Sequence, residues 1–294
     1  MTMPAPGRTR SRGALLWHRT GHAGPALLLS TLVLATALLM FPAAILAQPG
    51  GLALTTFPDV AGASGESQAL FLNPAAATEL ERSSVGFWSD LPQSDGEGPL
   101  YGLAVLDPGI TLAGGLVVTY TPREDGEPVS VSYSVAGRLG PAGLGIRPVW
   151  TRTGGGQARW TLDAGLAWHL APWVSLGLSG LDLAIGSAKH GPGRGVAGIT
   201  FTATPLQETL LEGAQLALGV VDEDLDHDGS LLGRAGLRIP LGHSLRLALG
   251  YQYDLESGES AGWGGSLAVS LGRLRLDLGY ESNQAYRAAL ELGW

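Results

Sequence analysis

The sequence predicts an all-β protein, a transmembrane antiparallel β-barrel of about 14 strands. Apolar and polar residues alternate strictly along many segments, and these segments recur at short intervals. Because side chains of a strand point alternately to opposite faces, each segment would present an apolar surface to lipid and a polar surface to a lumen. The 45 glycines and the absence of cysteine favour a closed sheet held by hydrogen bonds between strands rather than by disulfides.

Strand-like segments bounded by turn-forming residues follow one another from residue 83 to the end of the chain. Most are near the roughly 9–11 residues that a tilted strand needs to cross a bilayer. Short connectors such as Leu139-Gly140-Pro141 alternate with longer ones, which predicts short periplasmic turns and longer outer loops. The expected strands are 83–89, 99–107, 110–120, 129–139, 142–152, 158–170, 173–185, 194–205, 213–222, 230–239, 243–253, 262–271, 272–281 and 285–294.

The alternation is clearest at the C-terminus, where the chain stops on an aromatic residue. This ending resembles the C-terminal signal by which outer-membrane barrels are recognised for insertion, and the resemblance implies the barrel-insertion machinery as a partner. The residues that would form the signal share the apolar face of the last run: Tyr286, Leu290, Leu292 and Trp294.

The N-terminus has the layout of a secretory signal peptide. Arg8, Arg10, Arg12 and Arg19 precede an uncharged stretch that ends near Ala47, and cleavage there is expected. The alternative is an uncleaved helical anchor, since the stretch is long enough to span about 30 Å of hydrocarbon. The predicted domains are a signal peptide at 1–47, an N-terminal hatch or periplasmic segment at 48–82 and the barrel at 83–294.

The charge balance argues against nucleic acid as a partner. Four of the 18 basic residues and none of the 26 acidic ones precede Gln48, so the remainder carries a net charge of −12. Nucleic-acid binding needs a basic surface. The partner implied by an apolar outer face is outer-membrane lipid.

A segment before the first strand carries the motif Asn73-Pro74-Ala75. It resembles the Asn-Pro-Ala segment ahead of the first strand in FadL-type fatty-acid transporters and in the related PorV-type proteins. The resemblance implies a 14-stranded barrel around an N-terminal hatch, in the outer membrane of a diderm bacterium. It also implies a channel or transporter for small hydrophobic or amphipathic molecules. The chain is short for a fatty-acid transporter, and Asn-Pro by itself also favours a turn followed by a short helix.

Two other functions remain open on the sequence. One is a structural or secretion-accessory outer-membrane barrel without an open pore. The other is an N-terminally anchored periplasmic β-domain, because a soluble sheet with a buried apolar face alternates in the same way. Charged residues on the second face of the strands, together with the secretory N-terminus, favour the barrel.

Charged residues on the predicted inner face are the candidates for a functional lumen. A basic wall could attract anions or carboxylate headgroups. The alternative is an internal network of ion pairs that fills a narrow barrel, since interior charges need partners or water. The predicted lumen-facing residues are Arg234, Arg238, Arg246, Arg273, Arg275, Asp277, Arg287 and Glu291.

The sequence offers a possible calcium site and no catalytic motif. Asp224, Asp226 and Asp228 have the spacing of a calcium loop, but Ala235 stands where a calcium-binding helical loop ends in Glu. An acidic hairpin tip explains the same residues without metal. No Gly-x-Ser-x-Gly elbow or phosphate-binding loop occurs, so no enzymatic activity and no cofactor other than this possible Ca²⁺ is expected.

Overall fold

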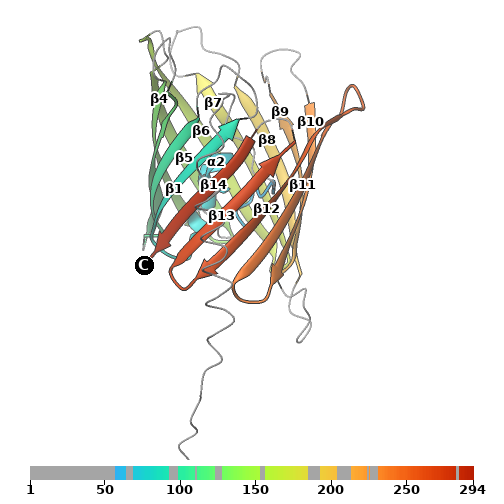
Figure 1. The fold of residues 1–294 in the computed structure, drawn as a ribbon. Coiled ribbons are helices and arrows are strands. Elements are labelled where there is room, and N and C mark those ends of the chain that lie inside the picture. Colours follow the sequence, from blue (N-terminus) through green and yellow to red (C-terminus); the bar gives the residue numbers. More distant parts are fainter. Residues whose placement is uncertain are drawn as a thin grey trace, which may run out of the picture. The chain divides into compact units, whose positions relative to one another are not determined.

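The computed structural model describes residues 57–63, 69–92, 99–109, 111–122, 128–152, 156–184, 193–203, 213–223, 225, 231–282 and 285–294. Its strands belong to one compact unit that spans residues 45–294. They close into an antiparallel barrel in which neighbours follow chain order and the last strand pairs with the first (Figure 1). The barrel of about 14 strands predicted from the alternation is therefore confirmed. The expected signal peptide at 1–47 lies outside the described residues.

The observed strands follow the predicted segments closely, and 129–139 and 142–152 coincide with β4 and β5. The strands are β1 (Ser84–Pro92), β2 (Leu100–Asp107), β3 (Leu112–Tyr120), β4 (Val129–Leu139), β5 (Ala142–Arg152), β6 (Ala158–Ala171), β7 (Val174–Ala184), β8 (Arg194–Thr202), β9 (Gln215–Asp222), β10 (Leu231–Leu241), β11 (Leu245–Asp254), β12 (Ser260–Leu271), β13 (Leu274–Glu281) and β14 (Ala285–Gly293).

Among the described residues two short helices precede the barrel, α2 (Ala69–Leu72) and η1 (Pro74–Glu79). The side chain of Asn73 accepts a hydrogen bond from the N–H of Ala75, and Pro74 occupies the first helical position, where no N–H is needed. The Asn-Pro-Ala motif is thus a helix start. In the part of the chain that the structure describes, no helix is long and apolar enough to cross a membrane.

The outer face of the barrel is apolar and carries aromatic residues near both ends. Trp160 and Trp168 lie at opposite ends of β6 and are 56% and 43% exposed. Near one end Tyr280 packs between Trp263 and Tyr286. Aromatic residues at these positions are typical of the two interfaces of a membrane-spanning barrel.

Short turns gather at the end of the barrel where the C-terminus lies (Figure 1). Four of them contain a glycine with positive φ: Gly109 (55°), Gly140 (62°), Gly242 (75°) and Gly272 (63°). An L side chain is disfavoured in that conformation.

Two strand pairs depart from regular pairing, β6 with β7 and β11 with β12. Leu162 pairs with Leu183 and Ala164 with Gly180, so Leu181 and Asp182 of β7 together face Asp163 of β6. Asp182 has φ 55°, uncommon for a residue other than glycine. Its N–H donates to Asp163 Oδ1 at 2.7 Å, so a side chain stabilises this β-bulge.

If the outer face lies in hydrocarbon, the cost of a charge there depends on depth. Leu218 is 43% exposed near the middle of β9, and Leu139 is 72% exposed at the end of β4. We expect Leu218→Arg to lower the free energy of unfolding in lipid vesicles by about 2–4 kcal/mol and Leu139→Arg by about 0–1. Equilibrium denaturation in vesicles measures both. Equal small losses would contradict a lipid-facing position for Leu218.

Candidate functional site in the barrel lumen

Residues 57–63 and 69–80, named the hatch segment here, lie against the inner face of the barrel. Glycines on that face make room for them. A Cβ at Gly165 of β6 would overlap the side chain of Asn73, and one at Gly145 of β5 would overlap the backbone at Pro74 and Ala75. Glycines thus let the two backbones approach closely. Similar close approaches occur at Gly143, Gly177, Gly198 and Gly236.

Hydrogen bonds join the hatch segment to several neighbouring strands. The side-chain amide of Asn73, which is fully buried, donates to the carbonyl of Leu166 and to that of Val60, both at 2.8 Å. These bonds fix the start of η1 both to the wall and to the first part of the hatch segment. Further bonds run from Arg138 to Thr78 O, from Ser179 to Leu72 O, from Thr200 to Asp59 and from Gln215 to Ala63 O.

A buried arginine of β5 stabilises α2. Arg147 is 3% exposed, and its Nη1 and Nη2 donate to the carbonyls of Leu70 and Phe71 at 2.6 and 3.2 Å. Its Nε donates to Asp163 Oδ2 at 2.7 Å. The other oxygen of Asp163 accepts from Asp182, whose carboxylate pairs with Arg194 at 2.6 Å. One polar chain therefore connects the helix ends, where carbonyls lack partners, with the β-bulge of β7.

At the other end of the hatch segment Glu79 forms a charged contact with the wall. Its carboxylate lies 2.9 Å from His169 Nε2 and 3.0 Å from Arg138 Nη2. Burial acts to raise the pKa of Glu79, but the contacts with His169 and Arg138 outweigh it and hold this pKa below its ordinary value. The hatch segment is therefore held at this end by a charge that is present at neutral pH.

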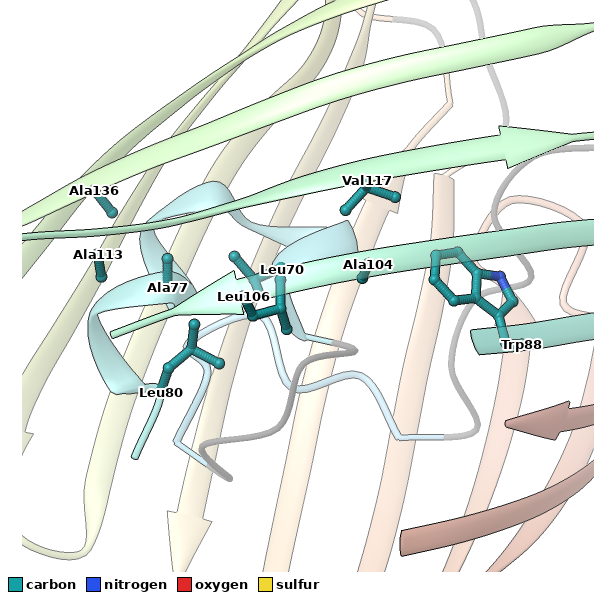
Figure 2. Packing of buried hydrophobic residues seen from close by; sticks show 9 residues of the cluster. All are labelled: Leu70, Ala77, Leu80, Trp88, Ala104, Leu106, Ala113, Val117 and Ala136. Atoms are coloured by element: carbon teal, nitrogen blue, oxygen red, sulfur yellow. The ribbon is translucent and has the colours of Figure 1, made fainter. Parts of the chain in front are cut away.

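The opposite side of the hatch segment makes apolar contacts. Figure 2 shows Leu70, Ala77 and Leu80 facing apolar side chains of the first strands of the barrel. The ring of Phe71 meets that of Trp88 edge to face, with centroids 5.1 Å apart, a favourable arrangement for aromatic pairs. The wall residues of this cluster are Trp88, Ala104, Leu106, Ala113, Val117 and Ala136.

A cavity of about 50 Å³ lies between α2 and the strands β1, β2, β3, β13 and β14. Leu70, Phe71, Trp88, Leu106 and Val117 form its apolar part. Its charged part consists of Arg275, Asp277, Arg287 and Glu291. The cavity thus has an apolar side and a polar side, as expected of a site for small apolar or amphipathic molecules.

The arginines at the cavity are paired with carboxylates. Arg287 binds Asp90 through two bonds of 2.6 and 2.8 Å. Arg275 binds Asp277 at 2.7 Å. The strand expected at 83–89 ends one residue before Asp90, so Asp90 was not predicted as the partner of Arg287.

The other predicted lumen residues lie in several environments. Arg238 donates to Gln215 at 3.0 Å and lies over the ring of Phe57 at 4.1 Å. Arg234 is buried, 8% exposed, and its Nε and Nη2 make no hydrogen bond. Arg246 shares the inner face, because it pairs with Ala268, a buried residue. Arg273 is different: it lies exposed in the turn before β13 and not on the inner face, because the strand begins at Leu274.

The remaining predicted sites are only partly described. Tyr286, Leu290, Leu292 and Trp294 lie on the outer face and are 43–59% exposed, and their role in insertion stays a prediction. Asp224, Asp226 and Asp228 lie outside the described residues. Within the described part of the chain, no group of His, Cys, Asp and Glu could hold a metal ion.

The sequence analysis also missed Arg147 and Asp163, which form the most buried ion pair of the hatch contact. Their signal was present, because both fall on the polar face of predicted strands. They lie far in the sequence from the cluster of arginines near the C-terminus that was predicted to face the lumen. Only the contact of Arg147 with Leu70 and Phe71, more than 70 residues away, gives the pair a role.

Comparison with solved structures supports the fold. The Pseudomonas putida toluene transporter TodX, a FadL-family protein, aligns with a TM-score of 0.54 and 9% identity over 76% of this chain and 91% of that chain. The Rhodopseudomonas blastica porin aligns with a TM-score of 0.43 and 7% identity over 72% and 99%. No protein-family model and no curated protein matches the sequence. The alignment with TodX confirms the predicted barrel fold.

The pair of Arg147 and Asp163 should contribute strongly to the stability of the barrel. Removing one partner of a buried pair leaves an uncompensated charge, so we expect Arg147→Met to lower the free energy of unfolding by about 3–5 kcal/mol. Arg138→Met removes an arginine that is 59% exposed and should cost about 0–1 kcal/mol. Urea denaturation in vesicles compares the two variants. Equal losses would mean that the Arg147 pair is no more important than a surface contact.

The Glu79 contact should make the stability depend on pH. The pKa of Glu79 in the folded protein lies below its ordinary value of 4.5, so its contribution is fully present above about pH 4.5 and is lost as the pH falls through the folded pKa. We expect Glu79→Gln to lower the urea midpoint at pH 7 and to leave a smaller difference from wild type near pH 3. The control is Glu81→Gln, at an exposed position. A constant difference between pH 7 and 3 would refute the assignment.

Proposed function

We propose that the protein is an outer-membrane channel or transporter for small hydrophobic or amphipathic molecules. The observation that supports this most directly is the cavity between α2 and the strands β1, β13 and β14, with Phe71 and Trp88 on its apolar side. A concave, mostly apolar site with a few polar groups is typical of small-molecule binding. The hatch segment would control passage through the barrel.

The ion pairs at the cavity favour molecules without a strong net charge. Arg275 and Arg287 each hold a carboxylate, and a paired arginine offers less attraction to an anionic headgroup than a free one. TodX is a toluene transporter by its description. Small aromatic hydrocarbons are therefore the first substrate class to test.

A structural or secretion-accessory barrel is the second candidate. It is favoured by the many hydrogen bonds that hold the hatch segment to the wall, among them those of Asn73 and Arg147. The cavity of about 50 Å³ is also small. Such a barrel would conduct neither with nor without its hatch segment.

Uptake of radiolabelled toluene tests the proposal. Cells that express the protein in the outer membrane should accumulate toluene faster than cells with an empty vector. The protein should also be recovered from the outer-membrane fraction as a band whose migration changes on boiling. Rates equal to those of the vector control, with the barrel present, would favour the accessory role. A product that is soluble once residues 1–47 are removed would instead favour the anchored periplasmic domain.

Deleting the hatch should open the lumen. We expect removal of residues 48–82 to raise the single-channel conductance in planar bilayers, because the inner face would lose the segment that fills the space beside its glycines. Leu216→Ala is the control, since Leu216 is 44% exposed on the outer face of β9. No rise in conductance, from a deletion variant that still migrates as a folded barrel, would count against a channel.

A further inference from the structure

We infer that solutes pass the hatch segment on the side of β1, β13 and β14, while the hatch segment stays docked on β4 to β10. This inference rests on the proposed transport function and adds the route. The route would use the cavity lined by Phe71, Trp88 and Ala289. Its substrates are neutral molecules with an apolar body.

The hydrogen bonds seen between the hatch segment and the barrel wall lie on one side of the hatch segment. The bonds seen between it and the wall come from consecutive strands: Arg138 of β4, Arg147 of β5, Leu166 of β6, Ser179 of β7, Thr200 of β8 and Gln215 of β9. Around α2 the division is sharp, because the carbonyls of Leu70 and Phe71 accept from Arg147 while their side chains line the cavity. One face of the helix is thus fixed, and the other makes only apolar contacts there.

On the docked side, the described part of the hatch segment lies directly against the wall. Gly145, Gly165 and Gly177 stand so close to the hatch segment that an added Cβ would overlap it. On the cavity side, a Cβ at Gly86 of β1 would meet nothing within 3.8 Å. Within the described residues, open space beside the hatch segment therefore occurs at Gly86 and not at these three glycines.

The cavity extends along the strands rather than across them. Ser84, Gly86 and Trp88 of β1 all line it, a span of roughly 13 Å at about 3.3 Å per residue. Residues 287–291 of β14 run beside them in the closing strand pair. Such an elongated site follows the direction that a transported molecule must take.

Opening this route requires small movements. Undocking the hatch segment would break the bonds of Arg147 to the carbonyls of Leu70 and Phe71 and the bond of Asn73 to the carbonyl of Leu166. Both side chains are 3% exposed or less, so the loss of these bonds is costly. Widening the cavity needs only a rotation of the Phe71 ring away from Trp88, a side-chain movement that breaks no hydrogen bond. The edge-to-face pair is therefore the narrow point of the route.

The charges beside the route select against ions. Arg287 is held by Asp90 and Arg275 by Asp277, so a charged solute would have to compete with an existing partner. An uncharged molecule displaces no partner and gains contact with Phe71 and Trp88. Substrates of this route are therefore neutral.

A disulfide that locks the hatch segment to the wall tests whether it must leave. The chain has no cysteine, so Thr78→Cys combined with Gly143→Cys gives one possible disulfide. A Cβ at Gly143 would lie 3.2 Å from Thr78 Cγ2, which places the pair within reach of a disulfide. We expect the oxidised double variant to take up radiolabelled toluene as fast as its reduced form. Loss of uptake on oxidation, restored by a reductant, would show that the hatch segment undocks and would overturn the inference.

Filling the cavity tests the route itself. We expect Ala289→Phe, inside the cavity, to reduce toluene uptake by about tenfold, a loss of the size that extra bulk in a packed site can produce. Ala288→Phe on the other face of the same strand is the matched control and should leave uptake unchanged. Phe71→Ala should raise uptake, and it does not depend on whether a larger side chain is tolerated. Migration before and after boiling verifies each barrel.

The outcomes separate the two proposals. If wild type takes up no toluene, the proposed function fails and the route fails with it. If wild type takes up toluene while Ala289→Phe does the same and Phe71→Ala brings no gain, only the route is wrong.

Discussion

The pairing of β1 with β14 is the constraint on which the other features depend. In hydrocarbon an unpaired backbone N–H or C=O costs several kcal/mol, so a membrane-spanning sheet must have no free edge. The register from Ser84 with Gly293 to Pro92 with Ala285 removes both edges at once. Closure also fixes which side chains face inward. It brings Asp90 to Arg287, 197 residues further along the chain, and so forms one wall of the cavity.

Closure gives the lumen two unlike walls. On β5 to β8 the inner face carries glycines, and the hatch segment fills the space that larger side chains would occupy. Hydrogen bonds of Arg147, Asp163 and Asn73 satisfy the polar groups that this contact buries. Buried polar groups without partners are costly. On β1 to β3 the inner face carries apolar side chains, with Trp88 the largest. The hatch segment therefore belongs to the interior of the barrel, with one docked side and one side that only packs.

The difference between the two walls bears on the proposed transport function. A hatch held on every side would seal the lumen, and a hatch held nowhere would leave it open. Here the charged network around Arg147 holds one side, whereas the contact of Phe71 with Trp88 on the other side can change by rotation of side chains. Paired charges beside the cavity keep its polarity without creating a strong binding site for ions. Passage past a docked hatch is compatible with all of these features.

The sequence by itself determined the strands and their two faces, because alternation with period two is a local property. It predicted β4 and β5 residue for residue, and it assigned Arg275, Asp277 and Arg287 to the inner face. It erred where a strand ends: Asp90 lies within β1, and Arg273 lies in a turn, since alternation does not mark the last paired residue.

Only the tertiary structure decided which inner residues meet across the lumen. The contact of Gly165 with Asn73 and the bond of Arg147 to Leu70 join positions more than 70 residues apart. Their proximity follows from the closure of the barrel and from the path of the hatch segment inside it, and no pattern within one strand encodes either.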